Sequence, residues 1–134
     1  GIPSRQFIQT YQAVLAAHEA AYEKIEAGIT CQEADKIARD VLTKEGYGEY
    51  FTHSLGHGVG LNIHEYPAVS PKGKGCLLNG MVYSIEPGVY LNGKFGIRIE
   101  DTVHMKLGKS ETFMTTTKDL CVLEDGKLKK YKIK

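Results

Sequence analysis

The sequence predicts an α+β domain in which two helices pack on a mostly antiparallel sheet. Two observations carry this prediction. Apolar residues recur at three- and four-residue steps in the first third of the chain, and after Tyr47 they alternate in short runs separated by glycines. With 134 residues, of which 42% are hydrophobic, the chain is long enough for one domain with its own core.

The first predicted helix begins at Pro3-Ser4 and ends at Gly28. Its apolar stripe consists of Phe7, Tyr11, Val14, Leu15, His18, Tyr22 and Ile25. His18 lies on this stripe, so we expect a packed or half-exposed histidine there and not a ligand.

The second predicted helix begins at Thr30, because Thr30-Cys-Gln-Glu33 has the spacing of a capping box, and it ends near Gly46. Asp35 and Asp40 are five residues apart and do not share a face. Asp35 lies four residues before Arg39, the spacing of a surface ion pair. We interpret these acidic residues as part of a solvated face.

Short strands are expected for the rest of the chain. They cover residues 51–55, 59–64, 81–87, 97–104, 111–116 and 119–124, with a loop over 68–80. Asn92-Gly93 marks a hairpin. The lysines near the end, from Lys127 to Lys134, are interpreted as a solvated terminal strand or tail.

Charge and cysteine usage exclude several classes of protein. The net charge is +1, so no basic field for nucleic acid is present. No apolar stretch approaches the roughly 20 residues of a membrane span. Cys31, Cys76 and Cys121 lack the spacing of a zinc ribbon, and their odd number argues against a disulfide framework. We therefore expect no nucleic-acid or membrane partner and a cytoplasmic location.

The segment from His53 to Glu65 holds three of the five histidines of the chain, His53, His57 and His64, interspersed with glycines. Imidazole is the commonest metal ligand in proteins and the usual general acid or base near neutral pH. Glycines allow the backbone to approach a metal or a substrate closely. The segment is therefore a candidate hydrolytic site.

Two glutamates interrupt apolar strands downstream. In the strand over 81–87, alternation places Glu86 on the face opposite Met81, Tyr83 and Ile85. In the strand over 97–104, a second polar face carries Arg98, Glu100, Thr102 and His104. A glutamate in such a strand is costly to bury unless it is paired or bound to a metal.

The length of the hairpin loop decides whether the two glutamates meet. A two-residue loop would set Glu86 opposite the apolar Ile99, whereas a three-residue loop sets Glu86 opposite Glu100. We predict the three-residue loop, with a bulge and with Leu91 paired to Phe95. Opposed carboxylates repel each other, so cations between them or a nearby arginine would have to resolve the conflict.

Two interpretations of the opposed glutamates follow. Either Arg98 forms an ion pair on a wet sheet face, or the glutamates bind metal together with a histidine. The histidine cluster favours metal, since one imidazole with two carboxylates suits Mn, Co, Zn or Fe as a hydrolytic Lewis acid. Two adjacent divalent ions would bind water and lower its pKa.

Three ordered motifs add a resemblance. They are His53-x-x-Gly-His57-Gly-Val-Gly-Leu-x-x-His64-Glu-x-Pro67, Ser84-Ile-Glu86-Pro-Gly-x-Tyr90 and Gly96-Ile-Arg98-Ile-Glu100-Asp101. Together they resemble the pita-bread metallopeptidases, which include methionine aminopeptidases, aminopeptidase P and prolidase. The second and third motifs are most similar to the branch that acts on Xaa-Pro bonds.

The resemblance implies roles for individual residues. The implied metal ligands are His57, Glu86 and Glu100, which would hold two divalent ions, Mn or Co before Zn or Fe. The implied catalytic residues are His53, His64 and Glu86, with Glu86 as the proton-shuttling acid/base. The implied substrate-binding residues are His53, His64, Tyr90 and Arg98. Asp101 points to the other face and is interpreted as structural.

The resemblance also implies that ligands are absent from this chain. The family has five, and its first two are aspartates upstream of the first helix, which nothing here matches. We therefore expect residues 1–134 to be the C-terminal part of one catalytic domain, with two N-terminal helices on a curved sheet. Alone it would be inactive and would bind metal weakly. The missing N-terminal segment is thus an expected partner.

The implied activity is hydrolysis of the bond between an N-terminal residue and proline, on a peptide with proline at the second position. A homodimer is a further expected assembly. Three alternatives stay open: a peptidase similar to methionine aminopeptidase, a non-catalytic module of this fold that binds peptides, and a metal-free hydrolase similar to creatinase.

Overall fold

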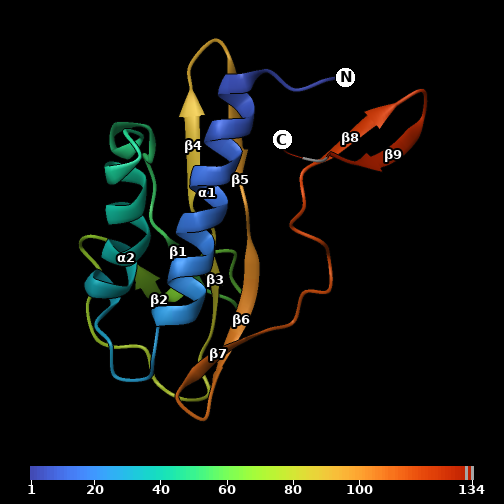
Figure 1. Cartoon of the computed structure of the whole chain (residues 1–134). Coiled ribbons are helices and arrows are strands. Elements are labelled where there is room, and N and C mark those ends of the chain that lie inside the picture. The colour runs from blue at the N-terminus through green and yellow to red at the C-terminus, as the bar shows by residue number, and fades with distance from the viewer. Residues whose placement is uncertain (132, 134) are drawn as a thin grey trace.

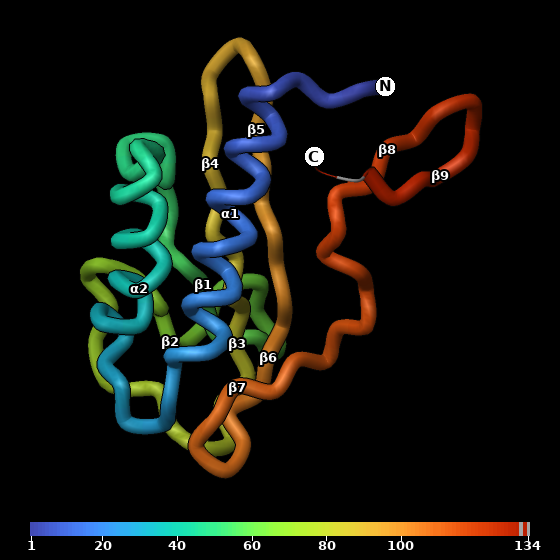
Figure 2. Tube along the Cα trace, in the orientation of Figure 1, coloured from blue at the N-terminus to red at the C-terminus, as the bar shows by residue number. Residues whose placement is uncertain are grey.

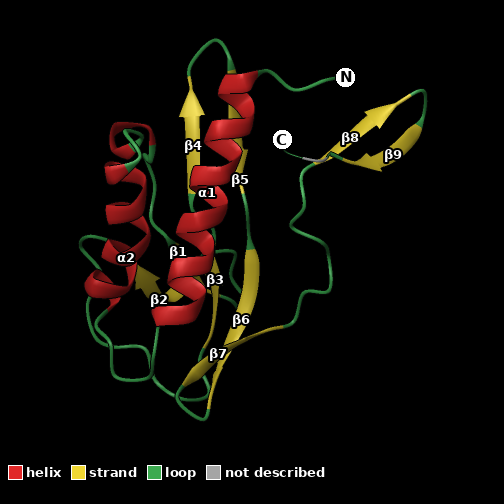
Figure 3. Cartoon of the chain, viewed as in Figure 1, coloured by secondary structure: helices red, strands yellow, loops and turns green. Residues whose placement is uncertain are grey.

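The computed structural model describes residues 1–131 and 133. Two helices, α1 (Arg5–Lys24) and α2 (Cys31–Lys44), lie side by side over one face of the strands (Figures 1 and 3). A 3-10 turn, η1 (Gly48–Tyr50), follows. The strands are β1 (Gly56–Gly58), β2 (Glu65–Val69), β3 (Val82–Ile85), β4 (Gly88–Leu91), β5 (Phe95–Arg98), β6 (Asp101–Lys106), β7 (Lys109–Thr112), β8 (Cys121–Glu124) and β9 (Lys127–Lys130). The predicted α+β class is confirmed.

Antiparallel pairing orders the main sheet β2-β1-β3-β6-β7, while β4 and β5 form a hairpin. Leu91 pairs with Phe95, so the predicted three-residue loop is confirmed. The register of this hairpin, in which Gly88 pairs with Arg98, continues in the main sheet, where Ile85 of β3 pairs with Asp101 of β6. Glu86 and Glu100 therefore occupy opposite positions between the two ladders, as predicted.

The predicted helix starts are confirmed by their caps. The Ser4 hydroxyl accepts a hydrogen bond from the Phe7 amide at 3.1 Å. At α2 the capping box is complete, because Thr30 and Glu33 each accept from the backbone N–H of the other at 3.1 Å. The core lies between these helices and the sheet, where Val14, Tyr83 and other apolar side chains are fully buried.

Two predicted strands are wrong. Residues 51–55 form an irregular segment, because side chains of α2 take up its backbone groups in place of a neighbouring strand. In the range 59–64, the Val59 amide still donates to the Val82 carbonyl at 3.1 Å, but residues 60–64 form bends, and the Asn62 amide donates to the Glu65 side chain at 3.1 Å. The loop predicted over 68–80 begins later, since β2 extends to Val69.

The remaining strands differ less from prediction. The strand predicted over 81–87 is divided at Glu86-Pro87 into β3 and β4. The chain after β7 leads away from the main sheet to the hairpin of β8 and β9 (Figure 2), and all four residues of the lysine-rich β9 are exposed. The Tyr11 hydroxyl holds this segment by donating to the Lys118 carbonyl at 2.9 Å.

One prediction about charge is wrong. Asp35 is not part of a solvated face, since only 1% of it is exposed. It does pair with Arg39, with 2.7 Å between Oδ2 and Nε, but the pair faces segment 51–55 and not solvent. Asp40 pairs instead with Lys36 on the exposed side of α2.

The three thiols are free, in agreement with the absence of a disulfide framework. Among the residues that the structure describes, no helix is both long enough and apolar enough to cross a membrane.

His18 is buried on α1 against a charged pair. Its Nε2 lies 3.6 Å from Asp101 Oδ2, beyond hydrogen-bonding distance, and neither ring nitrogen has a hydrogen-bond partner within the described part of the chain. Lys118 neutralises Asp101 at 2.8 Å. Burial lowers the pKa of His18 below its usual value, and the attraction of Asp101 offsets this only in part. His18 is therefore neutral in the folded protein.

This burial predicts a pH-dependent stability. The unfolded chain binds a proton at His18 below about pH 6.5 and the folded chain does so only at lower pH, so the free energy of unfolding falls with acidification. The slope from this group is at most about 1.4 kcal/mol per pH unit. Urea denaturation from pH 7.5 to 5 should show a smaller decline for His18→Phe than for the parent. Equal declines for the parent and His18→Phe would contradict this account.

Candidate active site

Glycines bring the histidine segment against the glutamate strand. A Cβ atom at Gly56 would lie 1.8 Å from the Ser84 carbonyl oxygen, so only glycine lets β1 approach β3 this closely. The Ser84 hydroxyl then accepts a hydrogen bond from the His57 amide at 3.0 Å. This contact places the His57 side chain beside the end of β3.

Glu86 is the buried charge of the site, with 7% of its surface exposed. Its Oε1 accepts a hydrogen bond from the Ser84 hydroxyl at 2.8 Å, and its Oε2 lies 3.4 Å from Arg98 Nη1. Its amide donates to the Leu55 carbonyl at 2.8 Å. These contacts offset the cost of taking a carboxylate out of water.

His57 and Glu86 point a ring nitrogen and a carboxylate oxygen at each other. The Nδ1 of His57 lies 2.9 Å from the Gly58 carbonyl oxygen, which can only accept, so Nδ1 carries a proton. The other ring nitrogen, Nε2, faces Glu86 Oε1 at 3.2 Å. Two such atoms are stable this close only with a proton or a metal ion between them. A histidine whose other nitrogen is fixed by a carbonyl is typical of metal sites, so these two residues fit a divalent ion.

His53, Tyr90 and Arg98 form a hydrogen-bonded chain beside Glu86. His53 Nδ1 donates to the Ser54 carbonyl at 2.8 Å, so Nε2 accepts from the Tyr90 hydroxyl at 2.9 Å. The same hydroxyl accepts from Arg98 Nε at 2.7 Å. This bond raises the pKa of Arg98, partly opposed by burial, so the guanidinium stays charged beside Glu86.

A pocket of about 550 Å³ opens over these groups, within the size range of small-ligand sites. Its walls include five residues predicted from the sequence, namely His53, His57, His64, Glu86 and Arg98. The His64 ring meets the His57 ring edge-on, with centroids 4.5 Å apart. A dipeptide-sized molecule would therefore contact both the histidines and the buried carboxylate.

Glu100 is the predicted ligand that the structure does not bring into the pocket. It occupies the position opposite Glu86, but its side chain is exposed. In the described part of the chain, no three His, Cys, Asp or Glu side chains are grouped closely enough to hold a metal ion. The structure thus assembles two of the three predicted ligands.

Two contributors to the site escaped the sequence argument. Ser84 shares the strand face of Glu86, so alternation could have indicated it. The Leu55 carbonyl, which accepts from the Glu86 amide, carries no sequence signal because it is a backbone group.

Comparison with known proteins assigns the class. Residues 1–106 match Metallopeptidase family M24, and the chain belongs to this family. It is 46% identical over 123 residues to the Xaa-Pro dipeptidase of Lactobacillus helveticus, covering 92% of this chain and 33% of the relative.

Solved structures agree with this assignment. Prolidase from Pyrococcus furiosus matches with a TM-score of 0.85 at 44% identity, over 87% of this chain and 35% of that one. The Xaa-Pro dipeptidase from Bacillus anthracis matches with a TM-score of 0.87 at 42% identity, over 90% and 34%. The predicted pita-bread resemblance is confirmed. The chain spans about a third of the length of these relatives.

The close approach of β1 to β3 predicts a steric effect. Gly56→Ala should lower the free energy of unfolding by about 1–3 kcal/mol, because the obstructing atom is a backbone carbonyl that cannot rotate away. Denaturant titration measures the loss. Gly93→Asn, at an open turn with φ of 72°, should cost less, since only the backbone conformation is at stake. Equal losses would show that the approach does not constrain position 56.

Proposed function

We propose that the protein containing this chain hydrolyses the peptide bond between an N-terminal residue and proline, using divalent metal. The observation that carries the proposal is the His57–Glu86 pair, whose Nε2 and Oε1 face each other at 3.2 Å in the wall of a pocket of about 550 Å³. The names of the relatives, Xaa-Pro dipeptidase and prolidase, support the substrate class. They favour it over an activity similar to methionine aminopeptidase or creatinase.

His57 and Glu86 would hold the metal, with Glu100 as the third ligand from this chain. A bound divalent ion would supply a Lewis acid and lower the pKa of a water molecule. An imidazole with carboxylates suits Mn or Co, and also Zn or Fe. Two further carboxylates would come from sequence outside these 134 residues, a proposal supported by the small share of each relative that the chain covers.

The chain's own residues would bind substrate and move protons. Glu86 is the acid/base: it takes a proton from water and passes it to the leaving nitrogen. His64 is exposed at the pocket and would hydrogen-bond the substrate carbonyl as it becomes tetrahedral. His53 bonds to the Tyr90 hydroxyl, which in turn holds the Arg98 guanidinium beside Glu86. The exposed sides of His53, Tyr90 and Arg98 would orient the peptide.

A cytoplasmic location is part of the proposal, supported by the three free thiols.

A dipeptide assay tests the proposed reaction. The protein, expressed with its flanking sequence, should cleave Ala-Pro with Mn²⁺ or Co²⁺ and should not cleave Ala-Ala at a comparable rate. EDTA should abolish the cleavage. Glu86→Gln keeps the size of the side chain but cannot shuttle a proton, so kcat should fall at least about 100-fold. Lack of metal-dependent cleavage of any Xaa-Pro peptide would reject the function and leave a peptide-binding module.

Metal affinity tests the incomplete ligand set. Residues 1–134 alone should be inactive and should bind Mn²⁺ weakly in calorimetry, because the ligands of this chain leave two ions underheld. The weak binding that remains should fall further in His57→Ala. Tight binding of two ions by these residues alone would contradict the division of ligands proposed above.

A further inference from the structure

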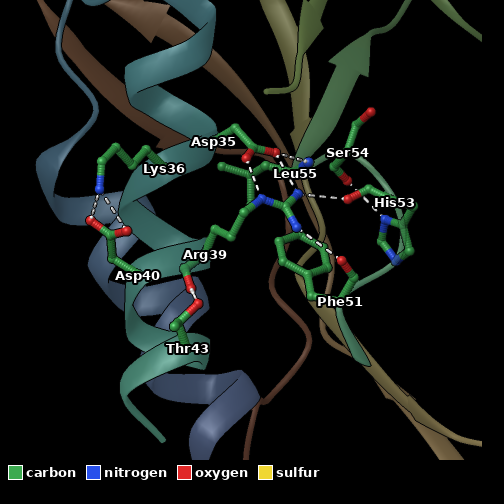
Figure 4. A network of polar contacts seen from close by, with 9 residues as sticks. All are labelled: Asp35, Lys36, Arg39, Asp40, Thr43, Phe51, His53, Ser54 and Leu55. Atoms are coloured by element: carbon green, nitrogen blue, oxygen red, sulfur yellow. Dashed lines mark hydrogen bonds and ion pairs between the residues drawn. The ribbon is translucent and has the colours of Figure 1, made fainter. Parts of the chain in front are cut away.

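Helix α2 sends two side chains toward the active-site segment 51–55 (Figure 4). The first is Asp35, which is 1% exposed. Its Oδ1 accepts from the Leu55 amide at 2.9 Å and from Arg39 Nη2 at 3.0 Å, and its Oδ2 accepts from Arg39 Nε at 2.7 Å. The carboxylate is thus satisfied on both oxygens, as a buried charge must be.

Arg39 extends the network from the carboxylate to the segment. Its Nη1 donates to the Phe51 carbonyl at 2.8 Å and its Nη2 donates to the His53 carbonyl at 2.9 Å. The guanidinium also lies over the Phe51 ring, 4.1 Å from the centroid. The planar fork of arginine makes these bonds simultaneously, which a lysine cannot do.

The segment needs this support because none of the described strands pairs with its backbone in a ladder. Its carbonyls at Phe51 and His53 and its amide at Leu55 are all held by α2 side chains. Buried backbone groups without such partners would be costly. The helix therefore determines the position of an irregular segment that carries a site residue.

Two routes connect this support to the site. In the first, the Phe51 ring meets the His53 ring edge-on at 5.2 Å, and His53 bonds through the Tyr90 hydroxyl to Arg98, which lies beside Glu86. In the second, the Leu55 amide donates to Asp35, and the Leu55 carbonyl accepts a hydrogen bond from the Glu86 amide. Both routes end at Glu86, the first at its carboxylate and the second at its backbone amide.

We propose that Asp35 and Arg39 are positioning residues for the active site: they hold segment 51–55 so that the His53 ring stays on Tyr90. Neither residue lines the pocket over Glu86, so Arg39 acts on the site through His53, and Asp35 acts on it through Leu55. The kinetic consequence rests on the proposed function, whereas the geometric one does not.

The same helix provides a matched control. Lys36 and Asp40 are also an acid–base pair at i, i+4, but both side chains are more than half exposed and, among the described residues, bond only to each other. Substituting Lys36 removes an ion pair of α2 without touching segment 51–55.

The kinetic experiment uses the protein with its flanking sequence, loaded with Mn²⁺ and assayed on Ala-Pro. Arg39→Lys keeps the charge beside Asp35 but loses the fork, so we expect kcat to fall about 10-fold with KM within about twofold. Lys36→Met should retain the parent kcat. Combined with His53→Ala, Arg39→Lys should lower kcat by less than about twofold more, because its effect passes through His53. The proposal would be overturned if the kcat losses of Arg39→Lys and His53→Ala multiply in the double variant. It would also be overturned if Lys36→Met lowers kcat as much as Arg39→Lys does.

A second measurement needs no activity. In ¹H–¹³C spectra of the imidazole rings, Arg39→Lys should shift the His53 signals, whereas those of His18 and His104 should stay in place as evidence of an intact fold. Lys36→Met should shift none of them. Unchanged His53 signals in Arg39→Lys would overturn the proposal. A parent protein that fails to cleave Xaa-Pro dipeptides would refute the proposed function only, and the spectra would still decide the positioning role.

Discussion

The buried carboxylate of Glu86 is the charge around which this structure is organised. A carboxylate with 7% of its surface exposed is stable only if its surroundings supply donors or cations. Ser84 and Arg98 provide part of this, and the Leu55 carbonyl holds the Glu86 backbone in place. The fourth neighbour, His57, points its Nε2 at Glu86 Oε1 from 3.2 Å, a contact that needs a proton or a metal ion between the two atoms. The pair therefore fits a divalent ion as well as it fits a proton.

Close backbone contact is what brings these groups together. The glycine at position 56 lets β1 lie against β3, and the Ser84 hydroxyl bridges the two strands by accepting from the His57 amide and donating to Glu86. Segment 51–55, in contrast, belongs to no ladder of the described strands, and its Phe51 and His53 carbonyls and Leu55 amide bond to side chains of helix α2. The site thus combines sheet pairing on one side with side-chain support on the other.

The parts of the fold that follow from local chemistry were predictable. The caps at Ser4 and Thr30 depend on residues three positions apart, and the hairpin register depends on the length of one loop. The two strand predictions that failed depended on alternation alone. Segment 51–55 alternates like a strand, yet the partner for its backbone is Arg39, distant in sequence and on a helix. A periodicity argument cannot identify such a partner.

The candidate site divides in the same way. The sequence by itself determined which chemical groups are available, that Glu86 and Glu100 occupy opposite positions, and that three histidines lie within one glycine-rich segment, because motif spacing and strand period are properties of the chain. Only the tertiary structure decided that Asp35 is buried, that Glu100 is exposed, that His53 is engaged with Tyr90, and that Nε2 of His57 faces Glu86. These outcomes depend on contacts between residues distant in the chain and on competition for burial among them, which no local pattern contains.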